Sequence, residues 1–165
     1  MQYKHKIPFI DKSAINLGAV IVGEVKIAKD VNLWYNSTIR GDMANITIEE
    51  GTNIQDNVVV HTNTGLDTYI GKMVTVGHSA IIHAATVEDY ALIGMGSIIL
   101  DGAKISKYAM VAAGTLVPPG KIVPERTLVM GNPMRIVREL SEKEIEANIN
   151  NAKLYIELAR SYKNG

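Results

Sequence analysis

Three histidines are the residues of this chain whose types and spacing point most directly to chemistry. His61, His78 and His83 fall within 23 consecutive residues, while His5 stands apart near the N-terminus. The chain has no cysteine, so a zinc site with cysteine ligands and an iron–sulfur cluster are excluded. Three neutral histidines with an open fourth position are typical of a catalytic rather than a structural zinc site. We therefore predict a metal centre with zinc favoured, while iron(II) and cobalt(II) suit the same ligands.

The elements that must position these histidines are defined by a repeat of six residues. A period of six fits neither a helix nor a free strand, and it indicates very short strands separated by turns. Three such strands close a triangular coil of about 18 residues. Large aliphatic residues mark the repeat in four runs: Ile15, Ile21, Ile27, Leu33 and Ile39; Ile48, Ile54 and Val60; Ile70, Val76 and Ile82; and Val87, Ile93, Ile99, Ile105, Val111 and Val117.

The repeat predicts a mainly β fold, a solenoid whose stacked coils bury one column of aliphatic side chains per face and leave no lateral sheet edge. The alternative is a meander of short antiparallel strands, which would need two-residue hairpin signals such as Asn-Gly between the runs. No such signal falls at the turns, so the solenoid is favoured. The spacing does not fix the handedness, but the pattern resembles that of the left-handed parallel β-helix.

The repeat also predicts how the chain is divided. We expect the β-helix over residues 1–120 and a connecting segment with a C-terminal helix over residues 121–165, together forming one domain. The repeat is interrupted where residues are added or lost, and such departures are where function tends to lie. The interruptions fall between Ile39 and Ile48, between Val60 and Ile70, where Leu66 to Tyr69 are expected to bulge, and between Ile82 and Val87.

A single amphipathic helix is predicted near the C-terminus. Ser141 and Glu144 form a capping box at its start, and the pattern runs to about Tyr162. A lone helix is not stable in water, so we expect it to pack along the solenoid or on a neighbouring subunit. Its apolar face is formed by Ile145, Ile149, Ala152, Ile156 and Ala159.

The phase of the repeat predicts a column of polar residues on one face. Arg40, His61 and His83 are each the second residue of units that lie three apart. They should therefore stack in successive coils, ~4.8 Å from one to the next. Two histidines at the same phase beside an interruption favour metal binding over the alternative of unrelated surface histidines.

His78 is predicted on the preceding face, directly above Asp56. From there it would reach His61 and His83 only from a second subunit. Solenoids packed side by side about a three-fold axis would complete the metal site in this way, and would also bring Asp56 to Arg40 as an ion pair. Such a contact between two different surface strips closes into a ring.

Composition excludes several classes of function. Lysine plus arginine and aspartate plus glutamate each number 17, so the zero net charge gives no support for binding nucleic acid or an acidic membrane surface. No apolar run reaches the ~18 residues of a membrane span, and the N-terminus lacks the apolar core of a signal peptide. We expect a cytoplasmic protein with no nucleic acid and no membrane among its partners.

As a set, these motifs resemble the gamma-class carbonic anhydrases over nearly the whole chain. The matching motifs are Arg40-Gly41-Asp42, Asn53-Ile54-Gln55-Asp56-Asn57 leading to His61, Val76-Gly77-His78, and Ile82-His83. The resemblance implies a homotrimer of left-handed β-helices with three metal sites between subunits. It implies that His61 and His83 come from one subunit and His78 from its neighbour.

The resemblance also assigns roles around the metal. Arg40 and Asp56 match an ion pair between subunits, and Asp42 matches the aspartate beside it. Gln55 matches a residue that hydrogen-bonds the metal-activated water, Asn53 lies close to it in the same motif, and Tyr155 is a weaker match to a tyrosine of the helix.

The implied activity is the reversible hydration of carbon dioxide to bicarbonate. The prototype has a glutamate directly after Arg-Gly-Asp and an acidic loop that moves protons, whereas this chain has Met43 there and only Asp67 in its loop. We therefore expect a carbonate dehydratase whose turnover is slowed by the missing shuttle. Two alternatives stay open: a hexapeptide-repeat acyltransferase with a histidine base, and a scaffold that keeps a metal site without the activity.

Overall fold

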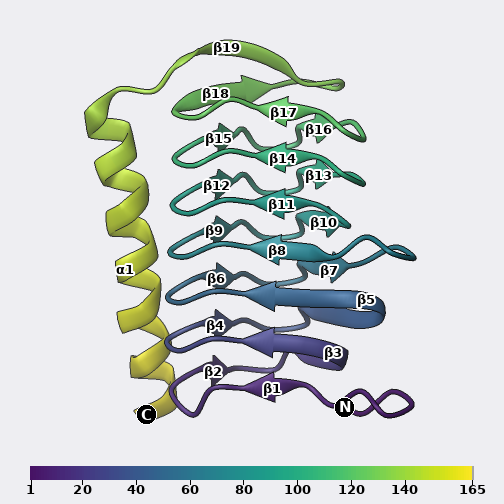
Figure 1. The fold of residues 1–165 in the computed structure, drawn as a ribbon. Coiled ribbons are helices and arrows are strands. Elements are labelled where there is room, and N and C mark those ends of the chain that lie inside the picture. Colours follow the sequence, from purple (N-terminus) through teal and green to yellow (C-terminus); the bar gives the residue numbers. More distant parts are fainter. Residues whose placement is uncertain (165) are drawn as a thin grey trace.

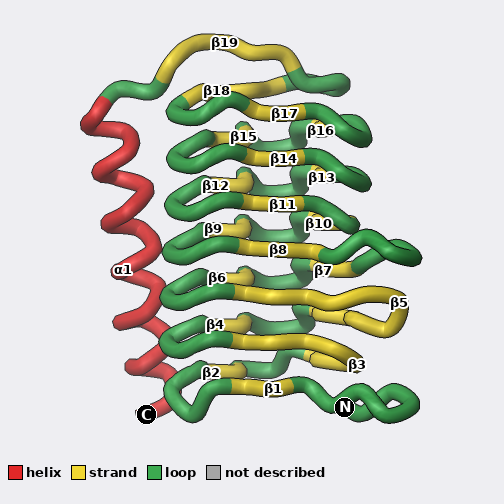
Figure 2. The backbone as a smooth tube through the Cα atoms, in the orientation of Figure 1, coloured by secondary structure: helices red, strands yellow, loops and turns green. Residues whose placement is uncertain are grey.

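The computed structural model describes residues 1–164 and shows a parallel β-solenoid with one long helix along its side (Figure 1). Gly165, the last residue of the predicted segment 121–165, lies outside the described residues. The chain winds upward from the N-terminus in a left-handed sense, and short strands alternate with turns at the corners (Figure 2). The fold class predicted from the six-residue repeat is confirmed.

The strands of successive coils pair in parallel register on three faces. The first face contains β1 (Phe9–Ile10), β8 (Thr68–Ile70), β11 (Thr86–Val87), β14 (Lys104–Ile105) and β17 (Ile122–Val123). The second contains β7 (Val59–His61), β10 (Ile81–His83), β13 (Ile98–Ile99) and β16 (Leu116–Val117). The third contains β2 (Ile15–Asn16), β4 (Asn32–Leu33), β6 (Asn53–Ile54), β9 (Thr75–Val76), β12 (Leu92–Ile93), β15 (Met110–Val111) and β18 (Thr127–Met130).

Two longer strands, β3 (Val20–Ile27) and β5 (Thr38–Ile48), turn the corner between the first and second faces. The first part of β5 pairs with β7 and its last part pairs with β8. Between β3 and β5 the register shifts after Gly23, which pairs with Gly41, so that Val25 pairs with Ile46. These are the three extra residues that interrupt the repeat before Ile48.

The core consists of three columns of stacked aliphatic side chains, one from each face, and their members are almost fully buried. Successive members of each column are residues that pair between neighbouring coils. The spacing of the aliphatic residues in the sequence therefore follows from the strand register. The columns are Ile27, Ile48, Ile70, Val87, Ile105 and Val123; Ile21, Ile39, Val60, Ile82, Ile99 and Val117; and Leu33, Ile54, Val76, Ile93, Val111 and Val129.

The solenoid extends beyond the predicted limit at residue 120. β17 and β18 add another set of parallel pairings, and the solenoid reaches Met130. The prolines at 118 and 119 lie in a turn, where no ladder hydrogen bond is required, so they do not end the repeat. The antiparallel strand β19 (Arg135–Glu139) then covers the last coil (Figure 1).

The bulge expected at Leu66 to Tyr69 lies earlier in the chain. Thr68 and Tyr69 belong to β8, where Tyr69 pairs with both Thr47 and Thr86. The loop that leaves the solenoid covers residues 62–67 and is closed by an antiparallel bridge between Asn63 and Leu66. The spacing located the interruption, but not the residues that resume the ladder.

The helix α1 (Glu142–Asn164) packs along the third face, against β2, β4, β6 and β9 of the same chain. Its predicted capping box is present: the Ser141 backbone N–H donates to Glu144 Oε2 at 2.9 Å, and the Glu144 N–H donates to Ser141 Oγ at 3.4 Å. The five residues predicted to form its apolar face are buried or partly buried. Within residues 1–164, no helix is both long and apolar enough to cross a membrane.

Candidate metal centre

The predicted column of Arg40, His61 and His83 is confirmed by the strand register. Arg40 of β5 pairs with His61 of β7, and His61 pairs with His83 of β10. Gly41 follows Arg40 at a point of close backbone approach, because a Cβ there would lie 2.5 Å from the carbonyl oxygen of Glu24. A glycine is therefore required between Arg40 and Asp42 while the strand turns its corner.

His61 and His83 face one another across neighbouring coils. Nδ1 of His61 lies 3.1 Å from Nε2 of His83. The other nitrogen of each ring contacts an aspartate: His61 Nε2 lies 2.9 Å from Asp42, and His83 Nδ1 lies 2.5 Å from Asp101. An ionised carboxylate only accepts hydrogen bonds, so it takes the single N–H of a neutral imidazole.

When each neutral ring gives its single N–H to its aspartate, His61 Nδ1 and His83 Nε2 are both acceptors and their lone pairs point toward one another. Two acceptors this close repel one another unless a cation lies nearby. Two nitrogens bonded to a tetrahedral zinc at ~2.0–2.1 Å lie roughly 3.3 Å apart. The observed 3.1 Å therefore fits two ligands of one metal ion.

Asp42 connects this pair of histidines to the predicted ion-pair residue. Arg40 donates to Asp42 through Nη1 within the same chain. Partial burial favours the neutral acid, but the hydrogen bonds from His61 and Arg40 and the charge of Arg40 outweigh it and hold the pKa of Asp42 below its ordinary value. Asp42 thus stays an acceptor for His61.

His78 lies on a different part of the coil from the other two histidines. Its Nδ1 lies 2.9 Å from Asp56 Oδ2, as expected for residues stacked on one face, and its side chain is 43% exposed. Within residues 1–164 of a single chain, no three histidine or acidic side chains are arranged to hold a metal ion. The chain therefore supplies His61 and His83 at one place and His78 at another.

Gln55 and Asn53 are buried beside His78. Gln55 Oε1 accepts the backbone N–H of His78 at 3.2 Å, and Gln55 Nε2 donates to Asn53 Oδ1 at 3.0 Å. Asn53 Nδ2 in turn donates to Thr75 Oγ1 at 2.9 Å. The Gln55 amide is thus held in a fixed orientation by partners on both of its ends.

Tyr155 reaches the same region from α1. Its ring packs edge-on against Trp34 with centroids 5.6 Å apart, and burial together with the nearby charge of Asp56 raises the pKa of its phenol. Together with Gln55 and His78 it lines a cavity of about 330 Å³ between the third face and the helix. The remaining wall of this cavity is largely apolar, with Leu92, Met95 and Met110 among its residues.

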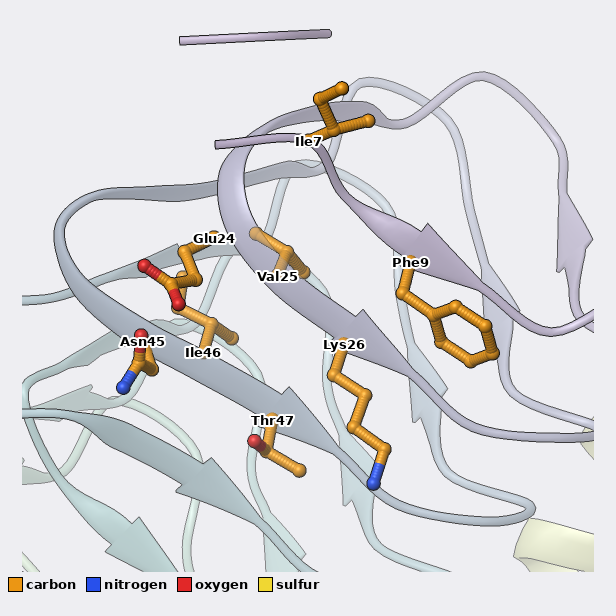
Figure 3. A pocket seen from close by; sticks show the side chains of 8 residues that line it. All are labelled: Ile7, Phe9, Glu24, Val25, Lys26, Asn45, Ile46 and Thr47. Atoms are coloured by element: carbon orange, nitrogen blue, oxygen red, sulfur yellow. The ribbon is translucent and has the colours of Figure 1, made fainter. Parts of the chain in front are cut away.

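A larger hollow of about 510 Å³ lies apart from the histidines, over β1, β3 and the last part of β5 (Figure 3). Phe9, Lys26 and Glu24 are among the side chains around it. None of its lining residues is a histidine or one of the aspartates that contact the histidines. The candidate site residues therefore lie at the smaller cavity and the histidine column and not at this hollow.

The sequence analysis did not predict two residues near the column, Asp101 and Asn63. Asp101 follows β13, and its other carboxylate oxygen accepts from Asn63 Nδ2 at 2.7 Å. The hydrogen bonds from Asn63 and then His83 hold the pKa of Asp101 below its ordinary value. The strand register could have pointed to Asp101. Ile82 pairs with Ile99, so residue 100 lies above His83 in the next coil and Asp101 is the residue after it.

Met43 and Asp67 lie at the two places where the resemblance led us to look for carboxylates that carry protons. Met43 is 48% exposed, beside Asp42. Asp67, the single carboxylate of the 62–67 loop, accepts from the backbone N–H of Asn45 at 2.8 Å. Its carboxylate thus already holds the loop against β5.

Comparison with known proteins agrees with this fold. No family model matches the chain. A protein of Methanocaldococcus jannaschii named probable carbonic anhydrase is 52% identical over 149 residues, covering 88% of this chain and 94% of that protein. Gamma carbonic anhydrase 2, mitochondrial, of Arabidopsis thaliana is 46% identical over 162 residues, which are 94% of this chain. This chain spans 58% of the length of the plant protein.

A solved structure gives the same result for the architecture. The crystal structure of a hexapeptide transferase family protein from Anaplasma phagocytophilum superimposes with a TM-score of 0.94 at 45% identity, covering 98% of this chain and 96% of that one. The fold and the paired histidines thus define a hexapeptide-repeat β-helix protein. Within that class, the chain belongs to the gamma carbonic anhydrase family.

Proposed function

We propose that this protein catalyses the reversible hydration of carbon dioxide to bicarbonate at a divalent metal held between subunits of a homotrimer. The observation that carries the proposal is the pair of facing nitrogens, His61 Nδ1 and His83 Nε2, 3.1 Å apart with an aspartate behind each ring. Carboxylate–histidine pairs of this kind are the usual surroundings of histidines that bind a metal.

The third ligand in this proposal is His78 of a neighbouring subunit. Its Nδ1 contacts Asp56, which leaves Nε2 to face outward from a half-exposed side chain. Three imidazoles and an open fourth position suit zinc, which is the favoured ion, and iron(II) and cobalt(II) accept the same ligands. When bound, such an ion acts as a Lewis acid and lowers the pKa of water toward ~7.

The positions of the two groups of residues support the proposed trimer. Arg40, His61 and His83 form a strip on the second face, and Asp56 and His78 form a strip near the third. If the first strip of one subunit packs against the second strip of the next, Arg40 meets Asp56. The same contact brings His78 to His61 and His83 and completes the proposed metal site. A contact between unlike strips closes into a ring when successive subunits are related by a suitable rotation, which in the proposed trimer is one third of a turn.

The chain's own polar groups would then orient the reactants. Gln55 is fixed by His78 and Asn53, so its amide can hold one orientation toward a water at the site. Asn53 supports Gln55 and is fully buried, which makes it a positioning residue. Tyr155 and the apolar wall of the cavity would keep bulk water from the side of the site near His78.

Each hydration cycle releases a proton that must leave the site. Met43 cannot carry it, and the Asp67 carboxylate is engaged with Asn45. External buffer is therefore expected to take the proton, so that turnover rises with buffer concentration over a wide range.

The proposal is tested by stopped-flow hydration of carbon dioxide with zinc-loaded and iron-loaded protein. Activity that depends on the metal, and rises with buffer at constant pH, would support it. Metal-loaded trimers without hydration activity above the buffer background would refute it and leave the scaffold alternative.

Acyl transfer is the second candidate, because the structural relative carries the name of the hexapeptide transferase family. In that reaction a histidine acts as general base at a subunit interface and needs no metal. Calorimetry with coenzyme A distinguishes the two, since a transferase should bind it in the metal-free protein. The facing pair of His61 and His83 favours the metal-dependent reaction.

A further inference from the structure

We infer that Asp101 is a positioning residue, which sets the tautomer of His83 so that Nε2 presents its lone pair to the metal, and that Asn63 holds Asp101 in place. This inference rests on the proposed function, because it concerns the same metal site. It assigns a task to two residues that the sequence motifs of the site do not include.

The contact between Asp101 and His83 is short and directed. Asp101 Oδ1 lies 2.5 Å from His83 Nδ1, while Oδ2 accepts from Asn63 Nδ2 at 2.7 Å. The two carboxylate oxygens thus have separate partners, one on each side of the group. Rotation of the Asp101 side chain would break both contacts, so the pair of hydrogen bonds fixes its orientation.

The backbone at Asp101 is also anchored. Its carbonyl oxygen accepts the N–H of Gly120 in the next coil at 2.9 Å, and the N–H of Gly102 donates to Ala84 O in the coil below at 2.7 Å. The turn that carries Asp101 is therefore bound to the coils on both sides of it. The carboxylate is presented to His83 from a rigid element rather than from a free loop.

The chemical consequence follows from the donors and acceptors of imidazole. A neutral ring has one N–H and one lone pair, and a carboxylate accepts only the N–H. With the proton of His83 on Nδ1, its Nε2 becomes the acceptor that faces His61 Nδ1 at 3.1 Å. In the opposite tautomer Nε2 would carry hydrogen and could not bind a metal.

Asn63 gives this contact a connection to the loop that interrupts the repeat. It lies in the 62–67 loop, where it forms the bridge with Leu66 and also reaches Asp101 in a later coil. The extra residues after β7 thus place an amide behind the carboxylate that supports His83. This is a physical reason for the interruption to occur directly after His61.

Zinc affinity measured by competition with a chelator is the first test. Removing a carboxylate behind a ligating histidine typically weakens metal binding ~10–100-fold. We expect a loss of that size for Asp101→Ala and a smaller loss for Asn63→Ala. Asp67→Asn is the matched control in the same loop and should keep the affinity of the wild-type protein, since Asp67 contacts Asn45 and not the site.

The tautomer itself provides a readout that needs no metal. In a metal-free His61→Ala background the facing nitrogen is absent, so the nitrogen-15 NMR signals of His83 report the effect of Asp101 alone. We expect the Nδ1–H tautomer to dominate there and to be lost when Asp101→Ala is added. Circular dichroism and thermal melting establish that each variant is folded.

Two results would overturn the inference: zinc affinity of Asp101→Ala within a factor of two of wild type, or a His83 tautomer unaffected by that substitution. If the wild-type protein itself binds no zinc, the proposed function fails, while the NMR measurement still decides the role of Asp101. Zinc binding by the wild-type protein therefore tests the proposed function, and the His83 tautomer tests the role of Asp101.

Discussion

The three histidines differ in which ring nitrogen their aspartate contacts. Asp42 contacts Nε2 of His61, whereas the aspartates beside His78 and His83 contact Nδ1. The free nitrogens are accordingly Nδ1 of His61 and Nε2 of the other two. Hydrogen bonding to a carboxylate also makes an imidazole a better electron donor, so each of these contacts would both orient and strengthen a proposed ligand.

Replacing Gln55 tests its role in the proposed hydration reaction. Its amide is fixed by two hydrogen bonds, and in the proposed reaction it holds the attacking water. Loss of one such hydrogen bond is worth ~1–1.5 kcal/mol, so Gln55→Ala should lower kcat for hydration roughly tenfold with no change in metal content. Met130→Ala, at an exposed position of β18 outside this cavity, is the control. An unchanged kcat in Gln55→Ala would remove Gln55 from the mechanism.

The sequence predicted the column of Arg40, His61 and His83 because a strict repeat determines which residues pair between coils. It did not predict Asp101, whose contact with His83 depends on the path of a turn and on side-chain rotamers. Nor did it predict that Arg40 contacts Asp42 in the single chain. Repeats determine register, but they do not determine where side chains at the corners point.

At the scale of elements, α1 depends on its capping box and on the side of the solenoid. Glu144 accepts a hydrogen bond from Ser141 and forms an ion pair with Arg138. The hydrogen bond from Arg138, and to a smaller extent those from Ser141, lower the pKa of Glu144 to about 2. At the far end, Arg160 pairs with Asp30 at 3.1 Å. Polar contacts near both ends thus hold the helix along the third face.

The depressed pKa of Glu144 predicts a pH dependence of stability. Its folded-state pKa of about 2 lies below the ordinary value of 4.5, so its contribution is fully present above about pH 5 and is lost as the pH falls toward 2. Urea unfolding of Glu144→Gln should show a deficit in the free energy of unfolding that is largest near neutral pH and shrinks on acidification. Glu146→Gln on the same helix is the control. A deficit that is constant from pH 7 to pH 3 would contradict the assignment.

The limits of the elements were predicted less well than their existence. The solenoid continues to Met130 because Val123 and Val129 keep the six-residue spacing beyond the two prolines. Those prolines lie in a turn, so their lack of N–H groups breaks no pairing. A repeat should therefore be followed through prolines that fall at its corners.

At the scale of the whole molecule, the residues that we propose as metal ligands lie on two separate strips of the single chain. The strip with Arg40 and the two facing histidines lies on the second face, and Asp56 with His78 lies near the third. A rigid solenoid cannot bend to bring the two strips together. In the proposed function, assembly of subunits completes the site, so oligomerisation and metal binding would depend on the same surfaces.

Arg40→Ala tests the assembly. Truncating one member of a desolvated charge pair costs ~2–5 kcal/mol at an interface, so dissociation should become at least roughly 30-fold easier per contact. Sedimentation over a dilution series should show trimers of the wild-type protein persisting where the variant dissociates. Arg135→Ala on β19 is the control and should leave assembly unchanged. Equal dissociation of Arg40→Ala and wild type would exclude an ion pair across the interface.

Mixed trimers of two inactive variants test the central claim most directly. His78→Ala and His83→Ala should each form trimers without metal, because every site lacks one ligand. In a trimer that contains both kinds of subunit, one interface joins an intact His61 and His83 to an intact His78 of the neighbour. Unfolding and reassembling the two variants together should therefore give one metal ion per mixed trimer. Mixed trimers confirmed by mass that hold no more metal than their parents would contradict a site shared between subunits.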